Sequence, residues 1–295
     1  MQDLRDLECL IALARFQHFA RAADSCGLSQ PAFSMRIRGL EERLGKKIVK
    51  RGNRFQGLTP DGMTVLEHAK LIVGQVQAME QEVKAKPGAL AGSLTIGVIP
   101  TAVAYAADVM QRMNAWHPGV KTQLKTDTSL SILQGVDDGH YDAGLVYTEV
   151  ASSDVLEIME LFGERYVLLM PTELVPKGQS TISWAEAALL PLILLEPDMQ
   201  NRRIVDRALR DAGGQPKVVA ETNEFLAAIL MVSKGTGAMV IPDVLHAALG
   251  GIRGTLALPL VKPELEKSVC LVSRRRERLV PTVAAFRDVL AAGPQ

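Results

Sequence analysis

Residues 20–45 read ARAADSCGLSQPAFSMRIRGLEERLG and predict the architecture of the N-terminal part. Gly27 predicts the end of a short helix with a small alanine face, because glycine accepts the left-handed conformation that follows a helix. Ser29 and Pro31 then predict a second helix, with the serine hydroxyl as N-cap and the proline in the first turn. One buried stripe along this helix is indicated by the spacing of Phe33, Ile37, Leu40 and Leu44.

The other side of the second helix carries groups that can read base edges. These polar residues are Gln30, Ser34, Arg36 and Arg38. Glutamine can pair with adenine through two hydrogen bonds, and arginine with guanine. A tight turn followed by a helix with such an N-terminus is typical of helix-turn-helix proteins, which place that helix in the major groove. The helix pattern alone would also fit a solvated basic helix pair.

The distribution of charge argues for the first interpretation. The 33 basic and 33 acidic residues cancel, but from Arg36 to Arg54 eight basic residues stand against Glu41 and Glu42, a local charge of +6. Residues 46–58, KKIVKRGNRFQGL, predict two short extended arms around Gly52-Asn53. The cations of such a wing would lie on phosphates or in the minor groove. The first 58 residues therefore predict sequence-specific DNA binding.

A long amphipathic helix is expected after the wing. Thr59-Pro60 is a helix-start pair, and the pattern runs to Pro87-Gly88. Its apolar residues follow a heptad spacing: Val65, Ala69, Ile72, Val76, Met79 and Val83. A lone helix of this length is only marginally stable in water, so the stripe must be covered. Either the helix packs on its own domain, or it pairs with a second chain in a coiled coil.

From residue 91 onward, strand and helix patterns alternate, which predicts an open, mostly parallel α/β sheet. Strands are expected at 93–98, 121–126, 142–147, 166–170, 192–195, 217–220 and 238–241. Ligands of such sheets bind beyond the carboxyl ends of strands, near helix N-termini that favour anions. A site for a small polar or carboxylate ligand is therefore predicted at Thr101, Thr126, Thr128, Ser129, Tyr147, Asn201, Arg202 and Asn223.

The N-terminal motifs resemble the winged helix-turn-helix signature of LysR-type transcriptional regulators. The matching positions are Ala22-Ala23, Leu28-Ser29-Gln30-Pro31-Ala32, Ser34, Ile37, Leu40-Glu41, Leu44-Gly45, Arg51 and Leu58-Thr59-Pro60-x-Gly62. His18 replaces the usual Ser, Phe33 replaces the usual Val or Leu, and Met35 stands where Arg or Gln often occurs. Residues 48–51 replace the usual Leu-Phe-x-Arg. The departure at Met35 affects the identity of at least one base contact.

The resemblance covers the entire chain and implies an α+β multidomain protein. Residues 1–58 would form the winged helix-turn-helix DNA-binding domain, 59–87 the linker (dimerisation) helix, and 91–295 a two-lobed α/β effector domain like the periplasmic binding proteins. Lobe I would comprise 91–162 and 267–295, and the inserted lobe II 163–266. The residues assigned to DNA are Ser29, Gln30, Pro31, Ser34, Arg36, Arg38, Arg51 and Arg54.

The resemblance also implies partners. These are double-stranded promoter or operator DNA, a small-molecule effector held between the lobes, RNA polymerase, and further copies of the chain. The copies would form a dimer joined through the linker helices, or a tetramer built from two dimers. We expect no cofactor and no metal.

The sequence argues against three other functions. An enzyme lacks sequence support, because no nucleotide-binding, nucleophile-elbow or zinc-protease motif is present and the five histidines are scattered. A solute-binding protein would need export, and no signal peptide is expected. A thiol-based redox sensor would need a reactive pair in lobe II, where no cysteine occurs. The odd, distant cysteines and the lack of a long apolar run predict a reducing cytoplasm and no membrane span.

Overall fold

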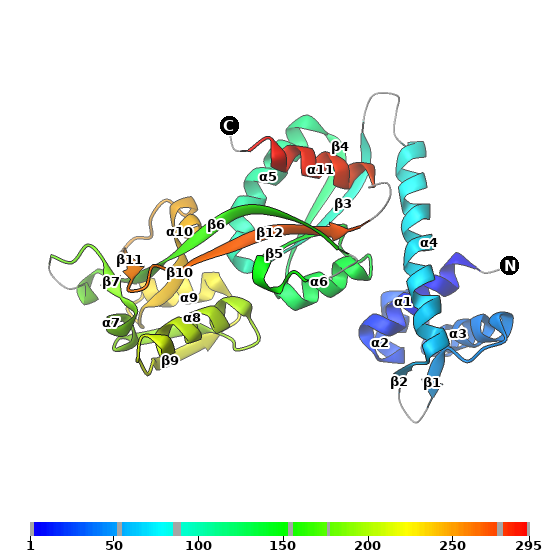
Figure 1. Ribbon diagram of the computed structural model, residues 1–295, viewed down its shortest axis with the longest axis horizontal. Coiled ribbons are helices and arrows are strands. Elements are labelled where there is room, and N and C mark those ends of the chain that lie inside the picture. Colours follow the sequence, from blue (N-terminus) through cyan, green and yellow to red (C-terminus); the bar gives the residue numbers. More distant parts are fainter. Residues whose placement is uncertain are drawn as a thin grey trace. The chain divides into compact units, whose positions relative to one another are not determined.

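The computed structural model describes residues 3–51, 55–84, 90–152, 156–175, 178–275 and 280–293. The chain forms two compact units, Met1–Ala91 and Gly92–Gln295. The first contains a winged helix-turn-helix followed by a long helix, and the second is a two-lobed α/β domain (Figure 1). The fold class predicted from the sequence is confirmed.

The N-terminal unit begins with three helices, α1 (Leu4–Phe16), α2 (Phe19–Ser25) and α3 (Gln30–Leu44). The Ser29 hydroxyl caps α3 by accepting from the Ala32 amide at 3.4 Å, and Gly45 ends it with a φ of 63°. The wing consists of β1 (Val49–Arg51) and β2 (Phe55–Leu58), which pair antiparallel. Arg54, and the Gly52-Asn53 pair at which a turn was expected, lie outside the described residues.

The core of this unit accommodates two of the departures from the family pattern. Phe33 is fully buried, and the Phe19 ring meets the rings of Phe33 and Phe55 edge-on, with centroids 6.2 Å apart in both pairs. A larger side chain at position 33 is therefore matched by aromatic neighbours. His18 replaces the usual capping serine and still caps α2, since its Nδ1 accepts from the Arg21 amide at 3.5 Å.

The long helix α4 (Pro60–Lys84) starts directly on the wing. The Thr59 amide donates to the Ile48 carbonyl at 3.0 Å, and the Thr59 hydroxyl donates to the Lys47 carbonyl at 2.7 Å. A Cβ atom on Gly62 would lie 2.0 Å from the Ile48 carbonyl oxygen. The helix and the wing backbone are therefore in contact at a point where only glycine fits.

The heptad stripe of α4 is covered only in part by its own domain. Ala69 is fully buried and Val65 packs against the same N-terminal core. Further along, Ile72, Met79 and Val83 are 47%, 56% and 79% exposed, and Leu71, which the heptad spacing does not include, is 49% exposed. Packing on its own domain thus accounts for the first part of the stripe, and the second part needs another cover.

The sheet of the C-terminal unit is mixed rather than mostly parallel. The strand order is β4 (Gly119–Thr126), β3 (Ala91–Val98), β5 (Ala143–Tyr147), β12 (Glu266–Arg274), β6 (Leu156–Pro171), β11 (Thr255–Val261) and β7 (Ile182–Ser183), with β10 (Met239–Pro242) also on β6. β3 and β5 are parallel, but β12 is antiparallel to β5 and β6, and β10 and β11 are antiparallel to β6. The prediction is wrong at the centre of the sheet because hydrophobic spacing reports burial and not strand direction.

The paired strands β6 and β12 join the two lobes, as Figure 1 shows. The first part of β6 pairs with β12, whereas Tyr166–Pro171 pairs with β10 and β11. The strand expected at 166–170 is therefore the second half of a longer one. Lobe I also contains α5 (Val103–Trp116), α6 (Ser129–Asp137) and α11 (Pro281–Ala291).

Lobe II is built around a second, parallel strand pair, β8 (Pro191–Leu195) and β9 (Lys217–Thr222). Its helices are α7 (Trp184–Ala188), α8 (Gln200–Asp211), α9 (Phe225–Ser233) and α10 (Asp243–Ala248). A buried apolar core joins β6, β8, α9 and β10 through residues such as Leu169, Ile193, Val232 and Ile241. The short elements β7, α7, α10 and β11 were not anticipated from the sequence.

Candidate functional site

The outer face of α3 presents mostly exposed side chains. Gln30, Pro31, Met35 and Arg38 are exposed, with Met35 at 67%, and Ser34 is partly buried. Among the described residues, neither Gln30 nor Arg38 makes a side-chain hydrogen bond or ion pair. This face is free to meet another molecule, and Met35 adds an apolar group that sequence reasoning did not include among the contacts.

Arg36 lies on a different flank of α3, facing α1. Its guanidinium donates to Asp6 at 2.8 Å and to Asp3 at 3.0 Å, and Arg43 donates to the other oxygen of Asp6. Asp6 is 3% exposed, and the hydrogen bonds to Asp6 and Asp3 raise the pKa of Arg36. The structure therefore gives Arg36 a role in holding α3 against α1.

A second buried carboxylate positions the wing. Glu41 is 2% exposed, and one of its oxygens accepts from the backbone amides of Ile48 and Val49 at 3.1 and 3.3 Å. Lys47 lies 3.6 Å from its other oxygen. Glu41 thus binds the chain where it leaves α3 and enters β1, which gives a physical reason for an acidic residue at this position of the motif.

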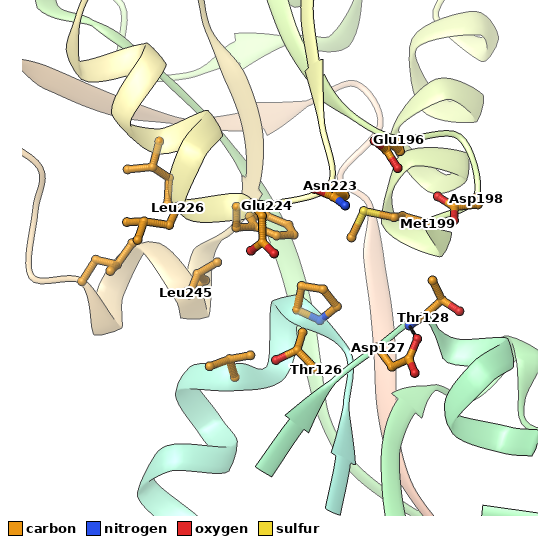
Figure 2. A pocket seen from close by; sticks show the side chains of 15 residues that line it. Thr126, Asp127, Thr128, Glu196, Asp198, Met199, Asn223, Glu224, Leu226 and Leu245 are labelled. Atoms are coloured by element: carbon orange, nitrogen blue, oxygen red, sulfur yellow. Dashed lines mark hydrogen bonds between the residues drawn. The ribbon is translucent and has the colours of Figure 1, made fainter. Parts of the chain in front are cut away.

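A cavity between the lobes of the C-terminal unit has a volume of about 510 Å³, within the range of small-molecule sites (Figure 2). Its walls come from the ends of β3 and β4 in lobe I and from the ends of β8 and β9, with α9 and α10, in lobe II. The lining residues beyond the carboxyl ends of the strands include Pro100, Asp127, Glu196 and Glu224. This is the position that an open α/β sheet favours for a ligand.

The structure divides the eight residues expected at the ligand site into three groups. Thr126, Thr128 and Asn223 line the 510 Å³ pocket. An adjoining small cavity of about 10 Å³, room for about one water molecule, is lined by Thr101, Ser129, Tyr147 and Asn201, with Thr128 shared. Arg202 lies outside both cavities.

Arg202 is held by neighbours within lobe II. Its guanidinium donates to Asp206 at 2.9 Å, to Glu221 at 2.7 Å and to the Leu195 carbonyl, and its side chain is 11% exposed. It therefore joins α8 to β8 and β9. The guanidinium that was expected to receive a ligand carboxylate already has two carboxylate partners.

A buried hydrogen-bond network behind the small cavity links the lobes. The hydroxyls of Tyr147 and Tyr166 donate to the same oxygen of Glu164 at 2.5 and 3.0 Å. Asn201 donates to the Tyr147 hydroxyl at 3.3 Å, and Thr101 lies 3.2 Å from it. Glu164 is fully buried, and its burial raises its pKa to about 7 against the lowering by the tyrosine hydroxyls. Sequence reasoning missed Glu164 because it lies inside a strand.

The large pocket also contains residues that the sequence did not single out. Its carboxylates are Asp127, Glu196, Asp198 and Glu224, and its apolar wall is formed by Val103, Phe225, Leu226, Ile229, Leu245 and Leu249. A signal was present, because Asp127, Glu196 and Glu224 follow strand ends within one or two residues. These carboxylates were not predicted, because only hydroxyl, amide and guanidinium groups were expected to contact the ligand.

Two family models together match nearly the whole chain. A model described as "Bacterial regulatory helix-turn-helix protein, lysR family" matches residues 4–63, and a model described as "LysR substrate binding domain" matches residues 87–295. The chain belongs to the LysR family of transcriptional regulators. The family prediction is confirmed, and the chain is a DNA-binding transcriptional regulator with an effector-binding domain and not an enzyme.

LysR-type relatives match along almost their full length. The hydrogen peroxide-inducible genes activator of Escherichia coli O6:H1 is 27% identical over 297 residues, which cover 97% of this chain and 96% of that protein. The SDS degradation transcriptional activation protein of a Pseudomonas species is 30% identical over 298 residues, which cover 98% and 96%. A full-length OxyR variant from Pseudomonas aeruginosa has a TM-score of 0.72 at 24% identity, covering 99% of this chain and 97% of that one, and supports the fold.

The described residues contain neither a membrane-spanning helix nor a cluster of metal ligands. Within the described ranges, no helix is both long enough and apolar enough to cross a bilayer. Among the same residues, no three His, Cys, Asp or Glu side chains gather closely enough to hold a metal ion. The carboxylates of the large pocket are thus spread along its walls rather than grouped around one point.

Proposed function

We propose that this protein is an effector-responsive regulator in which a small polar molecule binds in the 510 Å³ pocket and changes the placement of the DNA-reading helices in a dimer. The observation that carries this proposal is a pocket walled by both lobes, because a ligand touching both walls favours the closed arrangement. The coupling would act reciprocally, so operator DNA should change effector affinity by the same factor. RNA polymerase is the expected downstream partner.

We assign base reading to the free face of α3. Gln30 and Arg38 are the candidate base contacts, Ser29, Pro31 and Ser34 line the N-terminal end of the same helix, and Arg51 and Arg54 are assigned to phosphates. Arg36 is assigned to positioning α3, since its guanidinium is engaged by Asp6 and Asp3. Met35 is added as an apolar contact, for which a thymine methyl is a suitable partner.

Gln30→Ala should relax specificity at one base position of the operator. Loss of a bidentate glutamine–adenine pair should reduce discrimination at that position by about tenfold. Fluorescence anisotropy with an operator and its single-base variants measures this loss. Gln215→Ala, at an exposed glutamine of lobe II, is the matched control. Unchanged discrimination at every position would remove Gln30 from the reading face.

We assign dimerisation to the exposed part of the α4 stripe, with Val65, Ala69 and Val76 supporting it from the packed side.

Met79→Glu should weaken self-association at least about tenfold, because a charge would enter an apolar seam. Sedimentation velocity over a concentration series measures the effect. Leu189→Glu makes the same change at an 80% exposed leucine of lobe II and should leave association unchanged. If Met79→Glu associates like the original chain, the α4 seam is excluded as the dimer contact.

The name of the Escherichia coli relative raises peroxide sensing, but lobe II of this chain has no thiol pair that could serve it. Residues 163–266 contain no cysteine. Cys9 and Cys270 are fully buried, and burial raises the pKa of both thiols, that of Cys9 to about 12. A raised pKa disfavours the thiolate that reacts with an oxidant. The proposed signal is therefore a reversibly bound ligand.

A further inference from the structure

We infer that the effector is an organic cation with an apolar body, such as a primary or quaternary amine carrying an aliphatic or aromatic group. This inference rests on the proposed function, because it names the ligand class of the same pocket. It departs from the carboxylate ligand that the strand ends and helix N-termini suggested from sequence.

The wall of the pocket is acidic. Its four acidic residues, Asp127, Glu196, Asp198 and Glu224, come from both lobes, and none of the described lining residues is Lys, Arg or His. In the part of the chain that the structure describes, none of these four carboxylates forms an ion pair. An anionic ligand would enter a pocket with four negative groups and no basic partner.

The helix N-termini at the pocket favour anions. Helices α6, α8 and α9 begin there, α6 with Thr128 as its cap and α8 and α9 without a side-chain cap. Each helix end is equivalent to about half a positive charge, so the three supply about one and a half against four carboxylates. Some of the carboxylate charge therefore stabilises the helix ends, and most of it remains for a ligand.

Both carboxylate oxygens of Asp127 accept hydrogen bonds. One accepts from the Thr128 amide at 2.8 Å and the other from the Tyr141 hydroxyl at 3.2 Å. Both donors are neutral, so Asp127 is fixed in orientation without losing its charge. Figure 2 shows Asp127 beside Thr126 and Thr128 on one wall, with Glu224 and Asn223 on the facing wall.

The same wall also has an apolar surface that would contact the body of the ligand. Beside the carboxylates, the wall contains Phe225, Leu226 and Leu245, and Leu226 is 65% exposed. A hydrated metal ion would leave this surface in water, and the carboxylates are not grouped in threes within the described ranges. An amphipathic organic cation would use both parts of the wall.

A hydroxyl without a partner lies at the inner end of the pocket. Ser129 is 3% exposed, and its hydroxyl has no hydrogen-bond partner among the described residues. It lines the small cavity that shares Pro100, Thr128 and Met199 with the large one. A buried hydroxyl without a partner is unfavourable. A water or a ligand ammonium hydrogen placed there would satisfy it.

The test compares three probes that differ only in their polar end: 4-phenylbutylamine, 4-phenylbutan-1-ol and 4-phenylbutanoate. Isothermal titration calorimetry on the full chain measures each dissociation constant. The amine should bind at least about tenfold more tightly than the alcohol, and the alcohol more tightly than the carboxylate. Its affinity should fall with added salt.

Variants assign the effect to the pocket. Glu224→Gln should weaken amine binding about threefold, and Glu224→Gln combined with Asp198→Asn about tenfold, with alcohol binding unchanged. Glu173→Gln removes an exposed carboxylate elsewhere in lobe II and should have no effect. Equal losses for amine and alcohol would indicate a steric effect and would overturn the charge assignment.

The outcomes separate the two proposals. If the alcohol or the carboxylate binds at least as tightly as the amine, the cation inference fails and the effector pocket stands. If none of the three probes binds up to millimolar concentration, the pocket itself fails as the effector site, and the proposed function fails with it.

Discussion

Gly62→Ala is expected to destabilise the N-terminal unit by about 3 kcal/mol, the upper part of the usual range for overpacking. The added Cβ would lie 2.0 Å from the Ile48 carbonyl oxygen, which is backbone and cannot rotate away. The first turn of α4 must then move off the wing. This motion would strain the bonds from Thr59 to the Ile48 and Lys47 carbonyls.

Urea unfolding followed by two probes measures this effect. Both tryptophans, Trp116 and Trp184, lie in the C-terminal unit, so their fluorescence does not report the N-terminal one. Gly62→Ala should therefore show a circular dichroism transition at lower urea than the fluorescence transition. DNA affinity should fall together with the circular dichroism midpoint.

Gly39→Ala is the matched control, at a glycine inside α3. Its Cβ would meet only the far end of the Arg43 side chain, at 3.2 Å. The change in stability should stay within about 1 kcal/mol, the helix-propensity difference between glycine and alanine. If the Gly62→Ala chain is as stable as the original, the first turn of α4 does not lie against the Ile48 carbonyl oxygen.

Glu164→Gln is expected to reduce the change with pH in the free energy of unfolding of the C-terminal unit by about 3 kcal/mol. This is the free energy that corresponds to the difference between the folded and the ordinary pKa of Glu164. The pKa of Glu164 is about 7 in the folded chain, above its ordinary value of 4.5. Between these pH values the folded state binds more protons than the unfolded state. The stability that Glu164 contributes is therefore complete below pH 4.5 and is lost as the pH rises through 7.

Glutamine keeps the acceptor for the Tyr147 and Tyr166 hydroxyls but does not titrate. The variant should match the original chain near pH 4.5 and exceed it above pH 7. Urea unfolding followed by tryptophan fluorescence from pH 4.5 to 8 gives the comparison. Glu160→Gln, at an exposed carboxylate on the same strand, should follow the original curve. Parallel curves for Glu164→Gln and the original chain would contradict the burial argument.

The sequence was most informative where local chemistry determines structure. Ser29, Pro31 and Gly45 fix the ends of α3, and the spacing of Phe33, Ile37 and Leu40 identifies its buried face. These features depend on neighbours within one helix. The same reasoning could not separate Arg36 from Arg38, because only the packing of α1 shows that Asp6 lies beside one and not the other.

The ligand site was harder to predict because it is assembled from distant segments. The ends of β4, β8 and β9 meet only after folding, so the joint charge of Asp127, Glu196 and Glu224 is not visible in any one stretch. Arg202 was drawn into the expected site by its place near a strand end. One of its carboxylate partners, Asp206, lies four residues further along the same helix, at a spacing that pairs side chains. The other, Glu221, is on a strand that sequence spacing does not bring near it.

Sequence-specific DNA binding is tested by measuring the affinity of the purified chain for two duplexes of equal length over a range of salt concentrations. One is the duplex upstream of its own coding sequence, and the other is a shuffled sequence. We expect a preference of at least about a thousandfold for the upstream duplex, with both affinities falling as salt rises. Equal affinity for the two duplexes at every salt concentration would contradict a sequence-reading role for α3.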